Sequence, residues 1–207
     1  RRRAFGNGDA WLASHGIVAR PGERRVSLFC YANDAIGELL DVLSTEPTLL
    51  LATAGPAAEQ VEAHLGASLV RGALRAALLP LIPQAEFDHL LWSCALNFVR
   101  GEDSLARAIW AGSPFVWQLY IQDDGAHLAK LDAFLDRFLA DASVPLAHAV
   151  RTAFLRWNGA AQGSLATLGG DTALRAAWAT HCAGWRDALA AQSDLATRLV
   201  ALVEAKR

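Results

Sequence analysis

The sequence of 207 residues contains no methionine and only three cysteines. A chain without methionine lacks the residue that begins a newly made protein, so we expect a fragment or a trimmed product. Cys30, Cys94 and Cys182 are odd in number and widely spaced, and none of them belongs to a CxxC motif. This spacing does not suggest a zinc site, and it predicts buried free thiols.

A strong charge of one sign and long apolar runs are also lacking. The formal net charge is -2, which implies no general attraction to nucleic acid. No run reaches the roughly 20 apolar residues of a membrane span, and the opening arginines are not followed by the apolar run of a signal peptide. Because 53% of the residues are apolar and 19% charged, the composition is that of a globular protein, which we expect in the cytoplasm.

Short apolar runs alternate with stretches of helical spacing along most of the chain. Runs buried on both faces and separated by helices are typical of parallel sheets with right-handed crossovers. The sequence therefore predicts an α/β fold, a doubly wound and mainly parallel Rossmann-like sheet with helices on both faces. The expected strands are residues 26–31, 48–53, 74–81, 95–99 and 114–119, and the expected helices are 35–43 after an N-cap at Asn33, 56–64, 84–94, a helix from Asp103 or Ser104 to 111, and 127–139.

Only helical patterns follow residue 144, over residues 144–157, 172–191 and 195–204. A linker rich in small residues covers 159–170. We therefore expect a helical carboxyl-terminal extension, and its large aromatic side chains are expected to pack in the core or between domains.

The densest group of polar residues is 97–104, with the sequence NFVRGEDS. Parallel sheets bind ligands beyond the carboxyl ends of their strands, and here a glycine permits a sharp turn from a strand into a helix. The N–H groups at a helix start attract phosphate, and Arg100 can grip phosphate oxygens beside the hydroxyl of Ser104. Alternatively, Asp103 or Ser104 only caps the helix while Arg100 pairs with Glu102 on the surface.

A second group contains Phe29, Tyr31 and Phe87. Phe29 and Tyr31 are two residues apart near a strand end, so we expect them on one side, and Phe87 comes early in a following helix. Flat rings at a sheet edge either stack on a nucleobase or pack in the core. Gln84 either reads a base edge with its amide or caps the helix that follows.

The third group is residues 118–127, whose polar side chains either bind sugar hydroxyls or form a solvated turn in which Asp124 leads into a helix. His127 has no evident partner, so we expect a structural role. The sequence lacks GxSxG, HExxH and paired-carboxylate arrangements. Glu102 is the best-placed carboxylate for an active role. The residues thus predict a nucleotide and anion pocket without a complete catalytic set, a metal or a cofactor.

Residues 91–135 resemble the elongation factor P arginine rhamnosyltransferase family, and NFVRGEDS is the most specific part of the match. RVSLFCYAN at 25–33, LPLIPQAEFD at 79–88 and AQSDLATRLV at 191–200 resemble the same family. The resemblance runs from about residue 25 to residue 200. It implies the GT-B fold, in which two Rossmann-like domains face each other and the carboxyl-terminal domain holds dTDP-β-L-rhamnose.

The resemblance also implies roles for individual residues. The residues expected around the thymine nucleoside are Phe29, Tyr31, Gln84 and Phe87, and those expected around the diphosphate are Arg100, Asp103 and Ser104. Glu102 matches a family carboxylate implicated in activity. Leu81 stands where the family usually has Phe, which implies that base stacking on that side is weaker or is replaced by aliphatic contact. Ile121 stands where the family typically has Pro.

The implied reaction is inverting transfer of rhamnose to an arginine side chain of elongation factor P. Residues 1–24 would lead in from an absent amino-terminal domain that docks elongation factor P and carries the main catalytic aspartate. Residues 25–143 would bind the donor, and residues 144–207 would form the extension, its last helix packing toward that domain. We therefore expect this chain to bind donor without turnover. The alternatives are the donor half of another GT-B transferase and a non-catalytic nucleotide-binding module.

Overall fold

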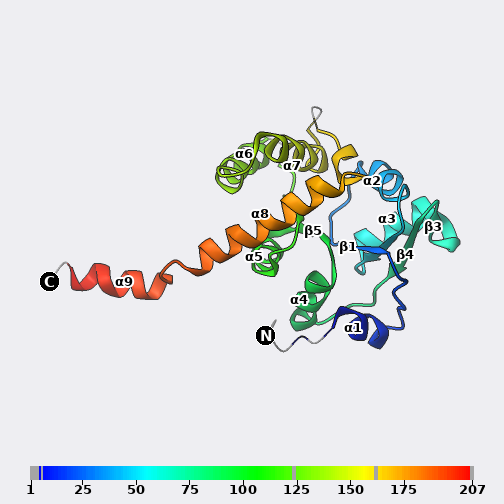
Figure 1. Ribbon diagram of the computed structural model, residues 1–207, viewed down its shortest axis with the longest axis horizontal. Helices are drawn as coiled ribbons and strands as arrows, with labels where there is room; N and C mark the ends of the chain where they lie inside the picture. The colour runs from blue at the N-terminus through cyan, green and yellow to red at the C-terminus, as the bar shows by residue number, and fades with distance from the viewer. Residues whose placement is uncertain (1–4, 6, 123–124, 161–162, 206–207) are drawn as a thin grey trace.

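The strands of the computed structural model form one six-stranded sheet in the order β3-β4-β2-β1-β5-β6 (Figure 1). The structure describes residues 5, 7–122, 125–160 and 163–205. Every neighbouring pair is parallel except β3 and β4, which pair antiparallel. The doubly wound, mainly parallel sheet predicted from the sequence is confirmed. The strands are β1 (Arg24–Leu28), β2 (Thr48–Ala52), β3 (Val70–Arg71), β4 (Leu74–Leu78), β5 (Leu96–Arg100) and β6 (Phe115–Gln118).

Helices connect the strands and then continue beyond the sheet (Figure 1). Those before and between the strands are α1 (Gly8–Ser14), α2 (Ile36–Leu43), α3 (Pro56–Leu65), the short η2 (Gly66–Ser68), α4 (Gln84–Ser93) and α5 (Gly101–Ala111). Those after β6 are α6 (Ala126–Phe138), α7 (Val144–Trp157), the short η3 (Ala166–Leu168), α8 (Thr172–Ala190) and α9 (Leu195–Glu204).

Strand β2 shows why both faces of the sheet are covered. Successive side chains of a strand point to opposite faces, and all five residues of β2 are buried. Leu50 and Ala52 belong to the larger apolar cluster, which includes residues of α2, α3 and α7. Leu49 and Leu51 belong to the second cluster, where α1 contributes Trp11 and α4 contributes other apolar residues. Burial on both faces explains why this strand has no polar alternation.

Several predicted boundaries are wrong. The helix expected to begin at Asp103 or Ser104 begins at Gly101, directly after β5. The first expected strand, 26–31, begins two residues earlier, because the parallel ladder pairs Arg24 with Thr48 at the start of β2, and it ends three residues earlier, at Leu28. The expected N-cap Asn33 is not the cap of α2, although its side-chain oxygen accepts a hydrogen bond from the N–H of Ala35.

The expected strand 74–81 ends at Leu78, and the two-residue strand β3 was not predicted, because it is too short to show a pattern. Residues 159–170, expected as a linker, contain η3. In the helical extension, α7 and α9 have the expected bounds. Phe154, Trp157 and Trp178 are buried in the core, as predicted.

Figure 1 shows α8 crossing the domain and α9 extending away from it. Helix α7 contacts β6 and α8, whereas large apolar side chains of α9 are exposed. Among the described residues, no helix is both long enough and apolar enough to span a membrane.

An ion-pair triad fastens α8 to the sheet. Glu46, just before β2, accepts hydrogen bonds from Arg24 of β1 and from Arg175 of α8. Arg24 also donates to the carbonyl of Leu168 in η3. Burial, and then the neighbouring charge of Arg175, lowers the pKa of Arg24. One carboxylate therefore compensates two partly buried guanidinium groups.

We expect Glu46→Ala to lower the free energy of unfolding by about 1–3 kcal/mol, because both guanidinium groups lose their shared acceptor. Urea unfolding followed by circular dichroism measures this change. Glu62→Ala removes an exposed carboxylate of α3 and serves as the control, with an expected change within about 0.5 kcal/mol. Equal losses in the two variants would contradict the role of the triad.

Candidate functional site

The strand order reverses beside β1, which has β2 on one side and β5 on the other. In open parallel sheets, ligands bind in the crevice beyond the carboxyl ends of the strands at such a switch point. Phe29 directly follows β1, and Arg100 is the last residue of β5. Two residues singled out in the sequence therefore stand at the two sides of this crevice.

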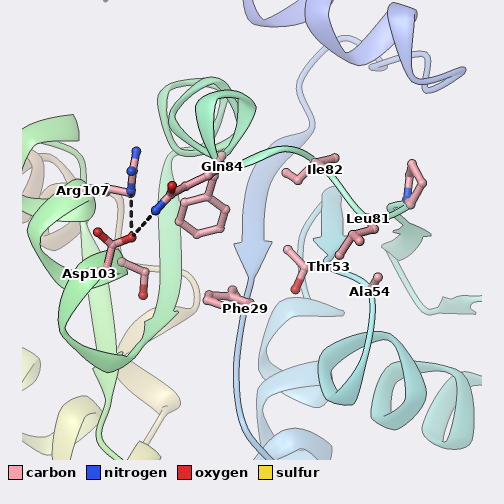
Figure 2. Close-up of a pocket in the computed structure, with 11 residues that line it drawn as sticks. Phe29, Thr53, Ala54, Leu81, Ile82, Gln84, Asp103 and Arg107 are labelled. Atoms are coloured by element: carbon pink, nitrogen blue, oxygen red, sulfur yellow. Dashed lines mark hydrogen bonds and ion pairs between the residues drawn. The ribbon is translucent and has the colours of Figure 1, made fainter.

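A cavity of about 250 Å³ lies at this edge of the sheet. Figure 2 shows its lining side chains, which come from the segments after β1, β2 and β4, from the first turn of α4 and from the first two turns of α5. Leu81 is 89% exposed and therefore lies at the rim. Six lining residues were predicted as binding residues: Phe29, Leu81, Gln84, Phe87, Asp103 and Ser104. The others are Thr53, Ala54, Pro80, Ile82 and Arg107.

The aromatic wall of the cavity consists of Phe29 and Phe87. Their ring centroids are 5.3 Å apart and their planes meet at 67°, an edge-to-face contact. The two rings therefore do not form a parallel-sided slot for a flat base. A base entering the cavity would lie against one ring face and the aliphatic side chains opposite it.

Asp103 is the centre of a chain of hydrogen bonds at the cavity (Figure 2). Its Oδ2 accepts from Arg107 Nε at 3.0 Å and from Gln84 Nε2 at 3.2 Å. Arg107 also donates to Asp88 of α4 at 2.8 Å. The hydrogen bonds from Arg107 and then Gln84 hold the pKa of Asp103 below its ordinary value. Gln84 therefore does not cap α4, because its amide points across to α5.

The start of α5 explains the NFVRGEDS pattern. Gly101 has a φ of 66°, which other residues rarely adopt, so the glycine permits helix α5 to begin without a linking turn. The Ser104 hydroxyl accepts from the N–H of Arg100 at 3.1 Å and donates to its carbonyl. Ser104 therefore bonds back to the residue that precedes the helix, and it also lines the cavity. No side chain caps α5, so the interpretation in which Asp103 or Ser104 caps this helix is wrong. The first N–H groups of any helix lack partners within the helix, which leaves this end suited to anions.

Arg100 lies between two aromatic rings. Its Cζ is 4.4 Å from the ring centroid of Phe29 and 4.5 Å from that of Tyr31, and its Nη1 donates to the carbonyl of Cys30 at 3.1 Å. The alternative interpretation, in which Arg100 pairs with Glu102 on the surface, is therefore wrong. Phe29 and Tyr31 do lie on one side, since both contact the same guanidinium.

Tyr31 lines a second hollow of about 190 Å³ with residues that follow β6. These include Tyr120, whose ring lies edge-to-face with Tyr31 at 5.7 Å between centroids, and Ile121. Of the polar group predicted at 118–127, only the first residues, 118–121, line this hollow. Asp123 and Asp124 lie outside the described residues. His127 is buried, and its Nδ1 accepts from the N–H of Gln122 at 3.2 Å, which supports the structural role predicted for it.

Glu102 does not line the cavity described above. Its side chain is 74% exposed and pairs with Lys130 of α6 at 2.5 Å. The hydrogen bond from Lys130 is the main cause of a lowered pKa for Glu102. The Lys130 ammonium also lies 5.6 Å from the ring centroid of Trp117. The carboxylate is therefore ionised at neutral pH and faces solvent beside the start of α5.

The cysteines lie apart from this chemistry. Cys30, Cys94 and Cys182 are buried free thiols, as predicted, and burial raises the pKa of each to about 12. Within the described part of the chain, no group of three or more His, Cys, Asp or Glu side chains is arranged to hold a metal ion.

Arg107 and Lys130 were missed from the sequence. Arg107 is one helical turn after Asp103, and this spacing could have indicated an ion pair on one helix face. Lys130 reaches Glu102 from a distant helix, so no local pattern indicates it.

The chain is similar to known proteins along its whole length. A family described as elongation factor P (EF-P) rhamnosyltransferase EarP matches residues 1–204. Protein-arginine rhamnosyltransferase from Pseudomonas aeruginosa is 41% identical over 201 residues, which covers 93% of this chain and 53% of the relative. The enzyme of the same name from Pseudomonas putida is 38% identical over 203 residues, covering 92% of this chain and 53% of the relative.

A solved structure described as "Structural basis for EarP-mediated arginine glycosylation of translation elongation factor EF-P" has a similar fold. The TM-score is 0.78 at 34% identity, and the match covers 100% of this chain and 66% of the other. The chain therefore spans about half the length of the curated relatives it matches.

We expect Lys130→Met to raise the pKa of Glu102 toward its ordinary value, because the variant removes the main hydrogen bond that lowers it. Carboxyl carbon resonances followed by NMR against pH measure this shift. Because the pKa of Glu102 is lower in the folded than in the unfolded chain, its pair with Lys130 stabilises the fold at a pH above the unfolded-state pKa. This stabilisation is lost as the pH falls through the folded-state pKa. Lys130→Arg retains the charge and is the control, and an unchanged Glu102 pKa in Lys130→Met would contradict the assignment.

Proposed function

The chain belongs to the EF-P rhamnosyltransferase family EarP, and we propose that it is the part of such an enzyme that binds the donor dTDP-β-L-rhamnose. The observation that carries this proposal is the crevice at the strand switch point. There an apolar and aromatic cavity lies next to a helix start and a guanidinium group, which is the combination that a nucleoside diphosphate requires.

The cavity suits the thymine nucleoside. Phe29 and Phe87 provide ring faces, and stacking of a base on an aromatic side chain is worth about 1–3 kcal/mol. Leu81 and Ile82 provide an aliphatic surface on the other side. The Gln84 amide can pair with polar atoms of the nucleoside once it leaves Asp103.

The start of α5 suits the diphosphate. Backbone N–H groups and the positive end of the helix dipole attract anions there. Arg100, at the N-cap position, supplies the cation, and its ring contact with Phe29 holds it beside the cavity. The Asp103 carboxylate would repel phosphate, so we assign its side chain to accept from donor hydroxyls while its helix turn contributes N–H groups.

The proposed reaction forms a bond between the anomeric carbon of rhamnose and an arginine nitrogen of EF-P, with inversion. The bond from that carbon to the dTDP oxygen breaks, dTDP leaves, and the nitrogen loses a proton to a carboxylate. Because a guanidinium has a pKa above about 12, that carboxylate must also orient it. Glu102 stands exposed beside the diphosphate position, where an incoming acceptor can reach it. No metal or cofactor has a role in this scheme.

We assign residues 25–143 to donor binding, residues 1–24 to a lead-in and residues 144–207 to an extension whose last helix packs toward the rest of the protein. The acceptor-docking domain and the main catalytic aspartate would lie in the half of the relatives that this chain does not span. On this proposal the chain alone binds donor without transferring rhamnose to EF-P.

We expect wild-type chain to bind dTDP-β-L-rhamnose selectively over UDP-glucose in a calorimetric titration. Arg100→Ala should weaken donor binding roughly ten- to a hundredfold, since a hydrogen bond to a charged group is worth about 1.5–3 kcal/mol.

Arg198→Ala removes an exposed guanidinium from α9 and is the matched control, with unchanged affinity expected. Equal affinity for both nucleotide sugars would favour a transferase with another donor. Absence of binding to either nucleotide sugar would contradict the proposal for this chain. If, in addition, the full-length protein transferred no sugar, a non-catalytic module would become the better interpretation.

The exposed apolar side chains of α9 lead to a separate expectation. Leu195, Leu199, Leu202 and Val203 fall along one face of the helix and are each more than half exposed. If this face normally packs on the rest of the protein, the isolated chain should self-associate as its concentration rises. Sedimentation velocity should show this behaviour, and Leu199→Lys should suppress it, whereas Ala201→Lys on the opposite face should not. A clean wild-type monomer at high concentration would refute the assignment.

A further inference from the structure

A buried amide connects the edge of the sheet to the aromatic contacts of Arg100. Gln118 is the last residue of β6, it pairs with Arg100 in the β5–β6 register, and it is only 1% exposed. Its side chain reaches the segment that follows β1: Oε1 accepts from the N–H of Tyr31 at 2.8 Å, and Nε2 donates to the carbonyl of Ala32 at 3.3 Å.

A second amide holds the same segment from the other direction. Gln60 of α3 donates from Nε2 to the carbonyl of Tyr31 at 3.2 Å and accepts at Oε1 from the N–H of Asn33 at 2.7 Å. Residues 31–33 have no helix or strand of their own, so these side chains satisfy backbone groups that regular structure would otherwise satisfy. Two glutamines therefore fix the backbone that carries Tyr31.

The position of this backbone determines where Arg100 lies. Tyr31 contributes one of the two rings that contact the guanidinium, and the preceding residue, Cys30, contributes the carbonyl that accepts from it. A guanidinium over a ring face gains electrostatic energy only within about 6 Å of the centroid. Displacement of residues 30–32 would thus release one ring contact and one hydrogen bond of Arg100 together.

We infer that Gln118 is a positioning residue, which sets the place of Arg100 through the backbone of Tyr31 and Ala32. Gln118 need not touch the diphosphate to act in this way. Its effect on donor binding rests on the proposed function, whereas its effect on the Arg100 side chain does not.

The first test detects Arg100 without any ligand. Protons held over aromatic rings resonate upfield in NMR, so the guanidinium signals of Arg100, assigned with Arg100→Lys, are expected upfield in the wild-type chain. Gln118→Met has a similar length but no amide, and it should move these signals toward the position of a free arginine. Gln60→Met should move these signals in the same direction. If Gln118→Met fails to fold, Gln60→Met still tests whether the backbone at Tyr31 positions Arg100.

Ser27→Ala is the matched control. It removes a different buried hydrogen bond, from Ser27 Oγ to Asn97 Oδ1 at 2.6 Å, in the interior of the sheet. A purely structural role for Gln118 predicts that both variants lower the melting temperature and neither moves the Arg100 signals. Unmoved signals in folded Gln118→Met would overturn the inference.

The second test is donor titration with dTDP-β-L-rhamnose. Gln118→Met should weaken binding on the order of tenfold, similar to Tyr31→Ala, while Ser27→Ala binds as wild type. Wild-type affinity in Gln118→Met would overturn the link from Gln118 to the donor. Absence of binding in the wild-type chain would count against the proposed function instead, and the guanidinium signals would still decide whether Gln118 positions Arg100.

Discussion

The reversal of strand order beside β1 is the constraint on which the site depends. Crossover connections carry the chain from β1 outward to β4 on one side, and then back to β5 and β6 on the other. The segments after β1 and β5 therefore diverge and leave a crevice between them. Phe29 and Arg100 stand at these two strand ends, so the topology brings a ring and a guanidinium together although they are far apart in the sequence.

Each charged group at the crevice already has a partner within the protein. Arg100 lies between aromatic rings, Asp103 pairs with Arg107, and Glu102 pairs with Lys130. A charge that loses its hydration without compensation is costly, and these contacts offset that cost. A bound diphosphate would exchange partners with these groups, and it would not meet unpaired charges. The net gain on binding is consequently smaller than the direct contacts alone would give.

Part of the helical extension supports the site, and part of it lies away from the site. At the end of α7, Asn158 accepts from the N–H of Leu119 at 2.8 Å and donates to the carbonyl of Trp117 at 2.8 Å. It thereby fixes the end of β6, where the side chain of Gln118 accepts a hydrogen bond from the N–H of Tyr31. Helix α7 is thus connected to the Arg100 position through the hydrogen bonds of Asn158 and Gln118 and the ring contact of Tyr31. Helix α9, in contrast, leaves its apolar face exposed.

The sequence by itself determined those helices and strands that a local pattern of residues indicates. The apolar run of β2 reports burial on both faces, and Asp194 caps α9 by accepting from Thr197, so the strand and the helix could be predicted. The family resemblance and the strand-end positions also indicated most of the residues that line the cavity. Only the tertiary structure decided that Arg100 stacks on rings while Glu102 turns to Lys130. Local patterns report burial and capping, but the partner of a charged side chain depends on which distant segments the fold brings within a few ångströms.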